Sequence, residues 1–131
     1  MKLFSPEKAN ALIPKVTPLV EELWVKRREL AIKLLENDPM LRPQQVQQTR
    51  LAGLKSPFAP GRFSELKAEI VRLINRIEAY GCIVKDMDLG LLDFPALREG
   101  EPIYLCWKAG ERTIEHWHGV EETFVDRKPL S

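Results

Sequence analysis

Residues 63–81, FSELKAEIVRLINRIEAYG, decide how the first part of this 131-residue chain folds. Apolar side chains recur there every three or four residues, at Phe63, Leu66, Ile70, Leu73, Ile77 and Tyr80. This spacing places them on one face of an α-helix and leaves the charged residues on the other faces. Gly81 suits the positive-φ position that often ends a helix. The stretch therefore predicts an amphipathic helix.

The residues before position 38 show a second helical pattern of apolar side chains. Pro14 and Pro18 interrupt it, and each removes a backbone donor and crowds the preceding turn. We therefore expect a short helix to about Leu12, followed by a kinked restart that ends near Asn37.

The two helices predict an antiparallel hairpin over residues 1–81, joined by a proline- and glycine-rich connector at 38–61. The stripe of the second helix is so regular that it also fits packing against another subunit. We therefore expect a homo-oligomer, with a dimer favoured.

After Gly81 the chain becomes rich in β-formers, with turn residues about every ten positions. This pattern predicts strands near 82–85, 91–94, 103–107 and 113–118, and then an irregular tail at 119–131 that covers an edge. The predicted fold class is α+β: one domain, residues 1–131, in which a long antiparallel helical hairpin packs on a small antiparallel β-meander at 82–131.

Composition restricts the partners of this domain. Apolar residues make up 44% and charged residues 30%, and the formal net charge is +1. This balance is typical of globular domains and gives no support for binding to nucleic acid or to an anionic membrane. No apolar leader or membrane span is expected, and two cysteines without a Cys-x-x-Cys pair are most simply reduced, in the cytoplasm.

A two-residue turn at 109–110 would pair Leu105 with Ile114 and place His116 and His118 on the same apolar face of the sheet. The two histidines could then share one divalent transition metal ion, which the net charge of −4 in residues 82–131 (six basic, ten acidic) would attract. The candidates for completing its coordination are Asp86, Asp88, Asp93, Glu111 and Cys106. The alternative, which we favour from sequence alone, is one histidine bonded in the core or an interface and one exposed.

Other residues permit catalysis or ligand binding, each with a structural alternative. Asp86, Asp88 and Asp93 could act as an acid and a base, although aspartates near glycine and proline usually form turns. Cys106 could be a nucleophile, although a cysteine in a strand is more often a small buried residue. Trp107 could stack on a planar ligand or fill the core.

Several short segments resemble an uncharacterised prokaryotic family, domain of unknown function 2203. They are Asn10–Pro14, Ile77–Asp86, Gly90–Pro95, Leu105–Trp107, Gly110–Glu111 and Trp117–His118. In the tail, Thr123-Phe124 and Asp126–Leu130 stand where the family usually has Gly-Phe and Gly-Arg-x-Pro-Leu, so two glycines are replaced.

The resemblance implies a coherent fold and no settled activity. Its segments mark a candidate constellation of Asp93, Cys106, Trp107, Glu111, His118 and Arg127. Three hypotheses follow, in order: an oligomeric binding or scaffold protein without catalysis; a metal- or small-ligand-binding domain that uses Asp93, Glu111 and His118; and a small hydrolase or isomerase that uses the same residues. Cys106, Trp107 and Arg127 are candidates for contacting a ligand.

Overall fold

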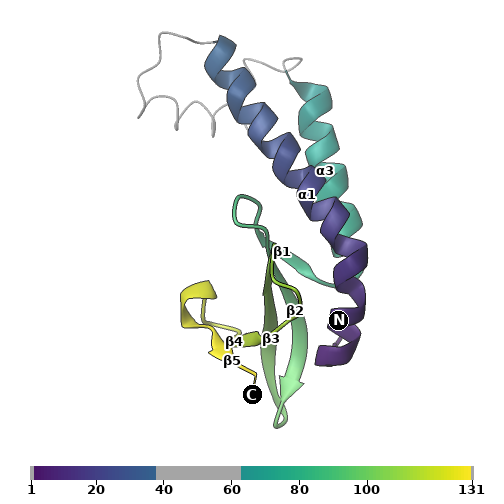
Figure 1. The fold of residues 1–131 in the computed structure, drawn as a ribbon, viewed down its shortest axis with the longest axis vertical. Helices are drawn as coiled ribbons and strands as arrows, with labels where there is room; N and C mark the ends of the chain where they lie inside the picture. The colour runs from purple at the N-terminus through teal and green to yellow at the C-terminus, as the bar shows by residue number, and fades with distance from the viewer. Residues whose placement is uncertain (1, 38–62, 131) are drawn as a thin grey trace.

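The computed structural model describes residues 2–37 and 63–130. They form two helices and a five-stranded antiparallel sheet, which confirms the α+β class (Figure 1). The elements are α1 (Pro6–Asn37), α3 (Ser64–Glu78), β1 (Ile83–Asp86), β2 (Leu91–Arg98), β3 (Glu101–Lys108), β4 (His116–Gly119), a 3-10 turn (Phe124–Asp126) and β5 (Lys128–Pro129). The predicted connector at 38–61 lies outside the described residues.

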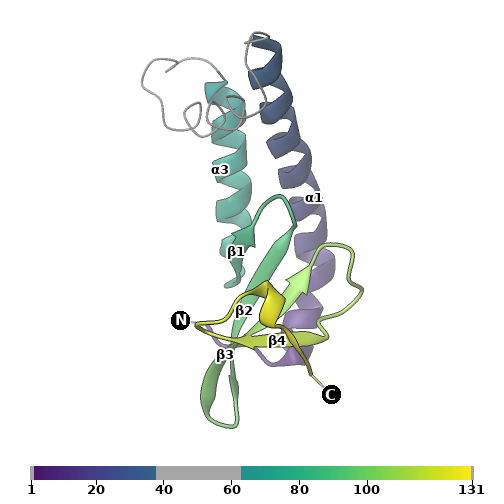
Figure 2. The same cartoon turned by 90° about the vertical axis from the view of Figure 1, so that its left-hand side faces the viewer.

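The apolar stripe of α3 packs within the chain. Leu66, Ile70, Leu73 and Ile77 are all buried, and they belong to the core cluster that also contains the inner face of α1. The two helices lie side by side as a hairpin (Figures 1 and 2). The surface on which we based the expected dimer is therefore already covered by α1.

α1 is one continuous helix of 32 residues, so the prediction of a short helix and a restart is wrong. Pro14 and Pro18 lie four residues apart, on one side of the helix, and both are exposed. Water can reach the carbonyl groups that lose their donors there, while Val16, Leu19 and Val20 remain buried in the core. Packing of the buried face thus stabilises the helix enough to keep it continuous at both prolines.

The strands follow one another in sequence order, β1 to β5, as a meander. Burial runs without interruption from Leu91 to Ala96, so both faces of β2 are covered. One face carries Leu92, Phe94, Ile103, Leu105 and Trp107 into the core shared with α1. The C-terminal segment lies across the other face, with the sheet between it and α1 (Figure 1). The polar residues described below lie on this second face.

The predicted pairing of β3 with the next strand is wrong by three residues. Leu105 pairs with Trp117 and not with Ile114, while His118 pairs with Tyr104 and His116 with Cys106. An odd shift moves every side chain to the opposite face of the sheet. The histidines therefore lie on the face away from α1, together with Cys106, and not on the apolar face of Leu105.

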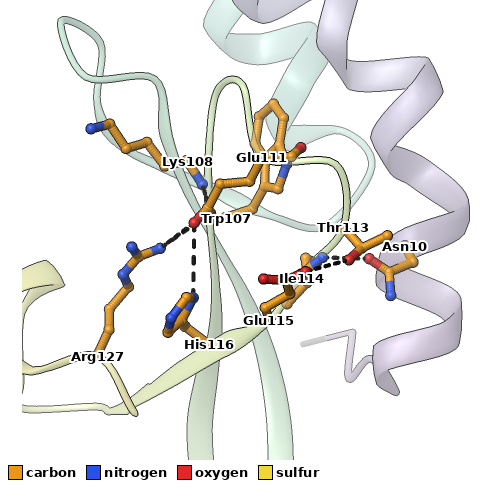
Figure 3. Close-up of polar contacts among 9 residues, drawn as sticks. All are labelled: Asn10, Trp107, Lys108, Glu111, Thr113, Ile114, Glu115, His116 and Arg127. Carbon is orange, nitrogen blue, oxygen red and sulfur yellow. Dashed lines mark hydrogen bonds and ion pairs between the residues drawn. The ribbon is translucent and has the colours of Figure 1, made fainter. Parts of the chain in front are cut away.

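Hydrogen bonds of the Trp107 and Asn10 side chains account for this shift, and the periodicity of apolar residues gives no sign of these bonds. The indole Nε1 of Trp107 donates to the carbonyl of Glu111 at 2.9 Å, and the amide of Ile114 donates to Oδ1 of Asn10 in α1 at 2.7 Å. Figure 3 shows Asn10 reaching from α1 to the loop. These bonds hold residues 111–115 outside the ladder, so pairing resumes only at His116.

The tail is more ordered than the predicted irregular segment. Its turn at Phe124–Asp126 is capped by Asp126, whose carboxylate accepts from the amide of Thr123 at 3.0 Å, and β5 then pairs with β4 along the edge of the sheet. No helix in residues 2–37 or 63–130 is long and apolar enough to cross a membrane.

Candidate functional site

Three metal-ligating side chains meet on the second face of the sheet. Asp93, Cys106 and His118 come from β2, β3 and β4, and all three residues are at most 3% exposed. Asp93 lies directly opposite Cys106 in the ladder, and His118 lies on the next strand. One ligand atom from each lies within 4.8 Å of the others. Alternation along three neighbouring strands thus brings a carboxylate, a thiol and an imidazole together.

The hydrogen bonds of His118 fix the orientation of its ring. Nδ1 lies 2.8 Å from the carbonyl oxygen of Gly119, which can only accept, so Nδ1 carries a proton. Nε2 lies 3.1 Å from both carboxylate oxygens of Asp93. In the neutral ring with this tautomer, Nε2 presents its lone pair toward Asp93.

Burial controls the acidity of the other two groups. It raises the pKa of the Asp93 carboxyl, although the nearby His118 and Lys85 lower that pKa in part. Burial, reinforced by the charge of Asp93, raises the pKa of the Cys106 thiol to about 12, while Arg127 opposes the shift. Burial also raises the pKa of Cys82, to about 11. Both thiols are therefore protonated at neutral pH.

A second polar cluster surrounds Glu111 (Figure 3). Its carboxylate accepts from the amide of Lys108 at 2.7 Å and from Nη1 of Arg127 at 3.0 and 3.1 Å. Nδ1 of His116 lies 3.8 Å away as a possible ion-pair partner when protonated. Because these donors occupy the carboxylate, Glu111 anchors the tail through Arg127 and is not among the ligand atoms that gather around Cys106.

The residues proposed as metal ligands thus divide into two groups. Asp93 and His118 lie together with Cys106, whereas Glu111 and His116 lie around Arg127. Arg127 lies near both groups, since its charge also lowers the pKa of the Cys106 thiol. Trp107, the remaining member of the constellation, is 1% exposed in the core on the other face of β3.

A pocket of about 390 Å³ opens in front of the first group. The three ligating residues line it, together with Lys85 of β1, Leu89 of the following turn, Leu91 of β2 and Glu122–Val125 of the tail. A volume of this size is typical of sites for small ligands. The nearly fully buried Asp93, Cys106 and His118 line the inner part of this space, and the exposed Lys85, Leu89 and Val125 lie around it.

Sequence reasoning missed the tail as a wall of this pocket. Phe124 lies beneath two cations, with Arg127 4.3 Å and Lys108 5.6 Å from its ring centroid. Lys85 was also missed, and its ammonium lies 4.9 Å from the centroid of the Tyr104 ring. Phe124 in the Thr123-Phe124 segment could have indicated this wall, because an aromatic side chain near Arg127 in a short tail usually packs against another part of the protein.

Comparison with known families places this site in context. Residues 2–130 match the family described as an uncharacterized conserved protein, DUF2203. The chain belongs to this family. No curated protein and no solved structure matches it.

Proposed function

We propose that this DUF2203 protein binds one zinc ion through Asp93, Cys106 and His118. The orientation of His118 is the observation that carries the proposal. Histidine ligands of metals usually donate their second ring N–H to a carboxylate or a backbone carbonyl, which fixes the tautomer. The bond from Nδ1 of His118 to Gly119 does this, and it directs Nε2 toward the other two ligands.

The charges of the three groups also fit a divalent ion. Asp93 as a carboxylate and Cys106 as a thiolate carry −2 together, and His118 is neutral with Nδ1 protonated, so a zinc ion makes the buried site neutral overall. A thiolate with an imidazole and a carboxylate is a donor set that zinc accepts. Ligand atoms around tetrahedral zinc lie roughly 3.5 Å apart. Nε2 of His118 and the Asp93 carboxylate are already 3.1 Å apart, and no pair of ligand atoms in the group is separated by more than 4.8 Å.

Three protein ligands leave one position of a tetrahedral zinc ion for an outside ligand, as in catalytic rather than structural zinc sites. The pocket beside Asp93, Cys106 and His118 supplies the space for that ligand. Arg127 favours the thiolate of Cys106, and Glu111 holds Arg127 in place. The proposed function is therefore a zinc domain that binds a small ligand, with Cys106 in place of the Glu111 that the sequence suggested.

The same geometry argues against Cys106 as a free nucleophile. Reactive cysteines have a lowered pKa and partial exposure. Cys106 is 1% exposed, and burial raises its pKa to about 12. A bound cation would remove that thiol proton, so the residue is better suited to ligation than to attack on a substrate.

Untagged protein purified without chelating resin is expected to hold about one zinc ion per chain by elemental mass spectrometry. His118→Ala should reduce the zinc content to less than about 0.1 per chain, because it removes a direct ligand. His116→Ala is the matched control. The ring of His116 lies beside Glu111 and is not a proposed ligand, so the zinc content of this variant should equal that of the wild type. Metal-free wild type that also fails to take up added zinc would refute the proposal.

Self-association is our second proposal, on a different surface from the one the sequence suggested. α1 exposes Trp24, Val25, Ile32 and Leu35 on its outer side. Arg28 and Glu29 lie beside them with opposite charges, so two antiparallel copies of α1 can pair the arginine of each with the glutamate of the other. This arrangement supports a two-fold dimer.

Sedimentation equilibrium tests the dimer. The wild type is expected at about twice the 15.1 kDa chain mass at tens of micromolar. Ile32→Glu should sediment as a monomer with an unchanged circular dichroism spectrum, because it adds charge within an exposed apolar stripe and leaves the core intact. A monomeric wild type would overturn this proposal and leave the zinc proposal untouched.

A further inference from the structure

The pocket in front of Asp93, Cys106 and His118 combines one cation with an apolar wall. Lys85 is exposed at its mouth, and its ammonium group is held over the ring of Tyr104. Among the described residues it forms no ion pair, although its charge does act on Asp93. A cation placed in this way can attract an anion to the open side of the site.

The acidic residues of the pocket have other partners. Oδ1 of Asp86 accepts from the amides of Asp88 and Leu89, both at 2.9 Å, within the turn after β1. Oε1 of Glu122 accepts from the amide of Gly119 and pairs with Lys128. Lys85 is therefore the cation of this pocket that remains for a ligand.

The rest of the wall is apolar. Leu89 and Val125 are 45% and 84% exposed at the rim, where large apolar side chains gain nothing from contact with water. Leu91 and Phe124 line the same pocket. A ligand with a hydrocarbon body could cover these side chains while its charged end faces Lys85 and the ligating residues.

We propose that the pocket binds the carboxylate of a small apolar acid, with one oxygen at the open zinc position and the charge paired with Lys85. This inference rests on the proposed zinc site. A pocket of about 390 Å³ has room for an aryl or branched alkyl group beside a carboxylate. The carboxylate could belong to a free acid or to the C-terminal residue of a peptide, since both present the same charge and apolar side chain.

Cobalt-substituted protein tests the inference, because the visible spectrum of Co²⁺ changes when an oxygen ligand joins a cysteine-containing site. Phenylacetate should shift the spectrum saturably, and phenylacetamide, its neutral analogue, should bind at least about tenfold more weakly. N-acetyl-glycyl-phenylalanine binding tighter than phenylacetate would identify the source as a peptide terminus, and the reverse order as a free acid.

Lys85→Met should weaken phenylacetate binding by about two- to fivefold while cobalt content stays at one per chain. Lys108→Met is the control, since this lysine lies near Phe124 but does not line the pocket. Equal affinity of Lys85→Met and wild type, or of the acid and its amide, would overturn the inference and leave the zinc site standing. Failure to bind cobalt or zinc would overturn both.

Discussion

Cys106→Ser is expected to weaken zinc binding by about 10³-fold while the protein stays folded. The substitution replaces a thiolate ligand with a neutral hydroxyl, and loss of a direct ligand costs more than the 10- to 100-fold typical of residues that only orient ligands. Titration of the metal-free protein against a chromophoric chelator measures the affinity. A factor of 10³ corresponds to about 4 kcal/mol of binding free energy.

Cys82→Ser is the matched control for this experiment. Cys82 is the other buried free thiol, and its Sγ contacts the carbonyl of Ile77 at 3.4 Å at the end of α3, apart from the ligand group. Both variants introduce a hydroxyl into a buried position, so their effects on folding should be similar. If Cys82→Ser weakened zinc binding as much as Cys106→Ser, the assigned ligand set would be wrong.

Leu73→Lys is expected to destabilise the fold by at least about 4 kcal/mol, a large part of the total stability of a small domain. Leu73 is 4% exposed between α3 and α1, so the substitution removes a buried apolar side chain and places an unpaired ammonium in its position. The melting temperature, followed by circular dichroism at 222 nm, should fall by more than about 15 °C, or the helices should not form at all.

Val71→Lys provides the comparison on the same helix. Val71 is 55% exposed and faces away from α1, so the free energy of unfolding should change by less than about 0.5 kcal/mol. A Leu73→Lys variant as stable as Val71→Lys would show that α3 does not bury this stripe against α1.

The sequence predicted most of the fold because its main signals are local. The spacing of Leu66, Ile70, Leu73 and Ile77 determines both the helix and its buried face. The turns at Gly90, Gly100 and Gly110 have positive φ, and the strands between them form the expected meander. The break at Pro14 was wrong because tertiary packing overrode a local penalty.

The site was harder to predict, because it depends on pairing and on contacts between distant residues. Asp93, Cys106 and His118 were all candidates, but the expected register directed the histidines to the other face of the sheet. The bond between Asn10 and Ile114 joins residues 104 positions apart, and no local pattern reveals it. The three-residue shift in the pairing of β3 with β4 therefore decided which candidate ligands lie near Cys106 and which lie near Glu111.

The bond between Asn10 and Ile114 has a consequence for the order in which the protein folds. The hairpin of β2 and β3 closes through a two-residue turn, so Asp93 and Cys106 can meet early and locally. We expect His118 to join them later, because the register of β4 depends on residues 111–115, and the bond from Ile114 in that segment to Asn10 in α1 requires closure of a much longer loop. Zinc uptake should therefore be a late folding event, and its rate would report when the helical and β layers have docked.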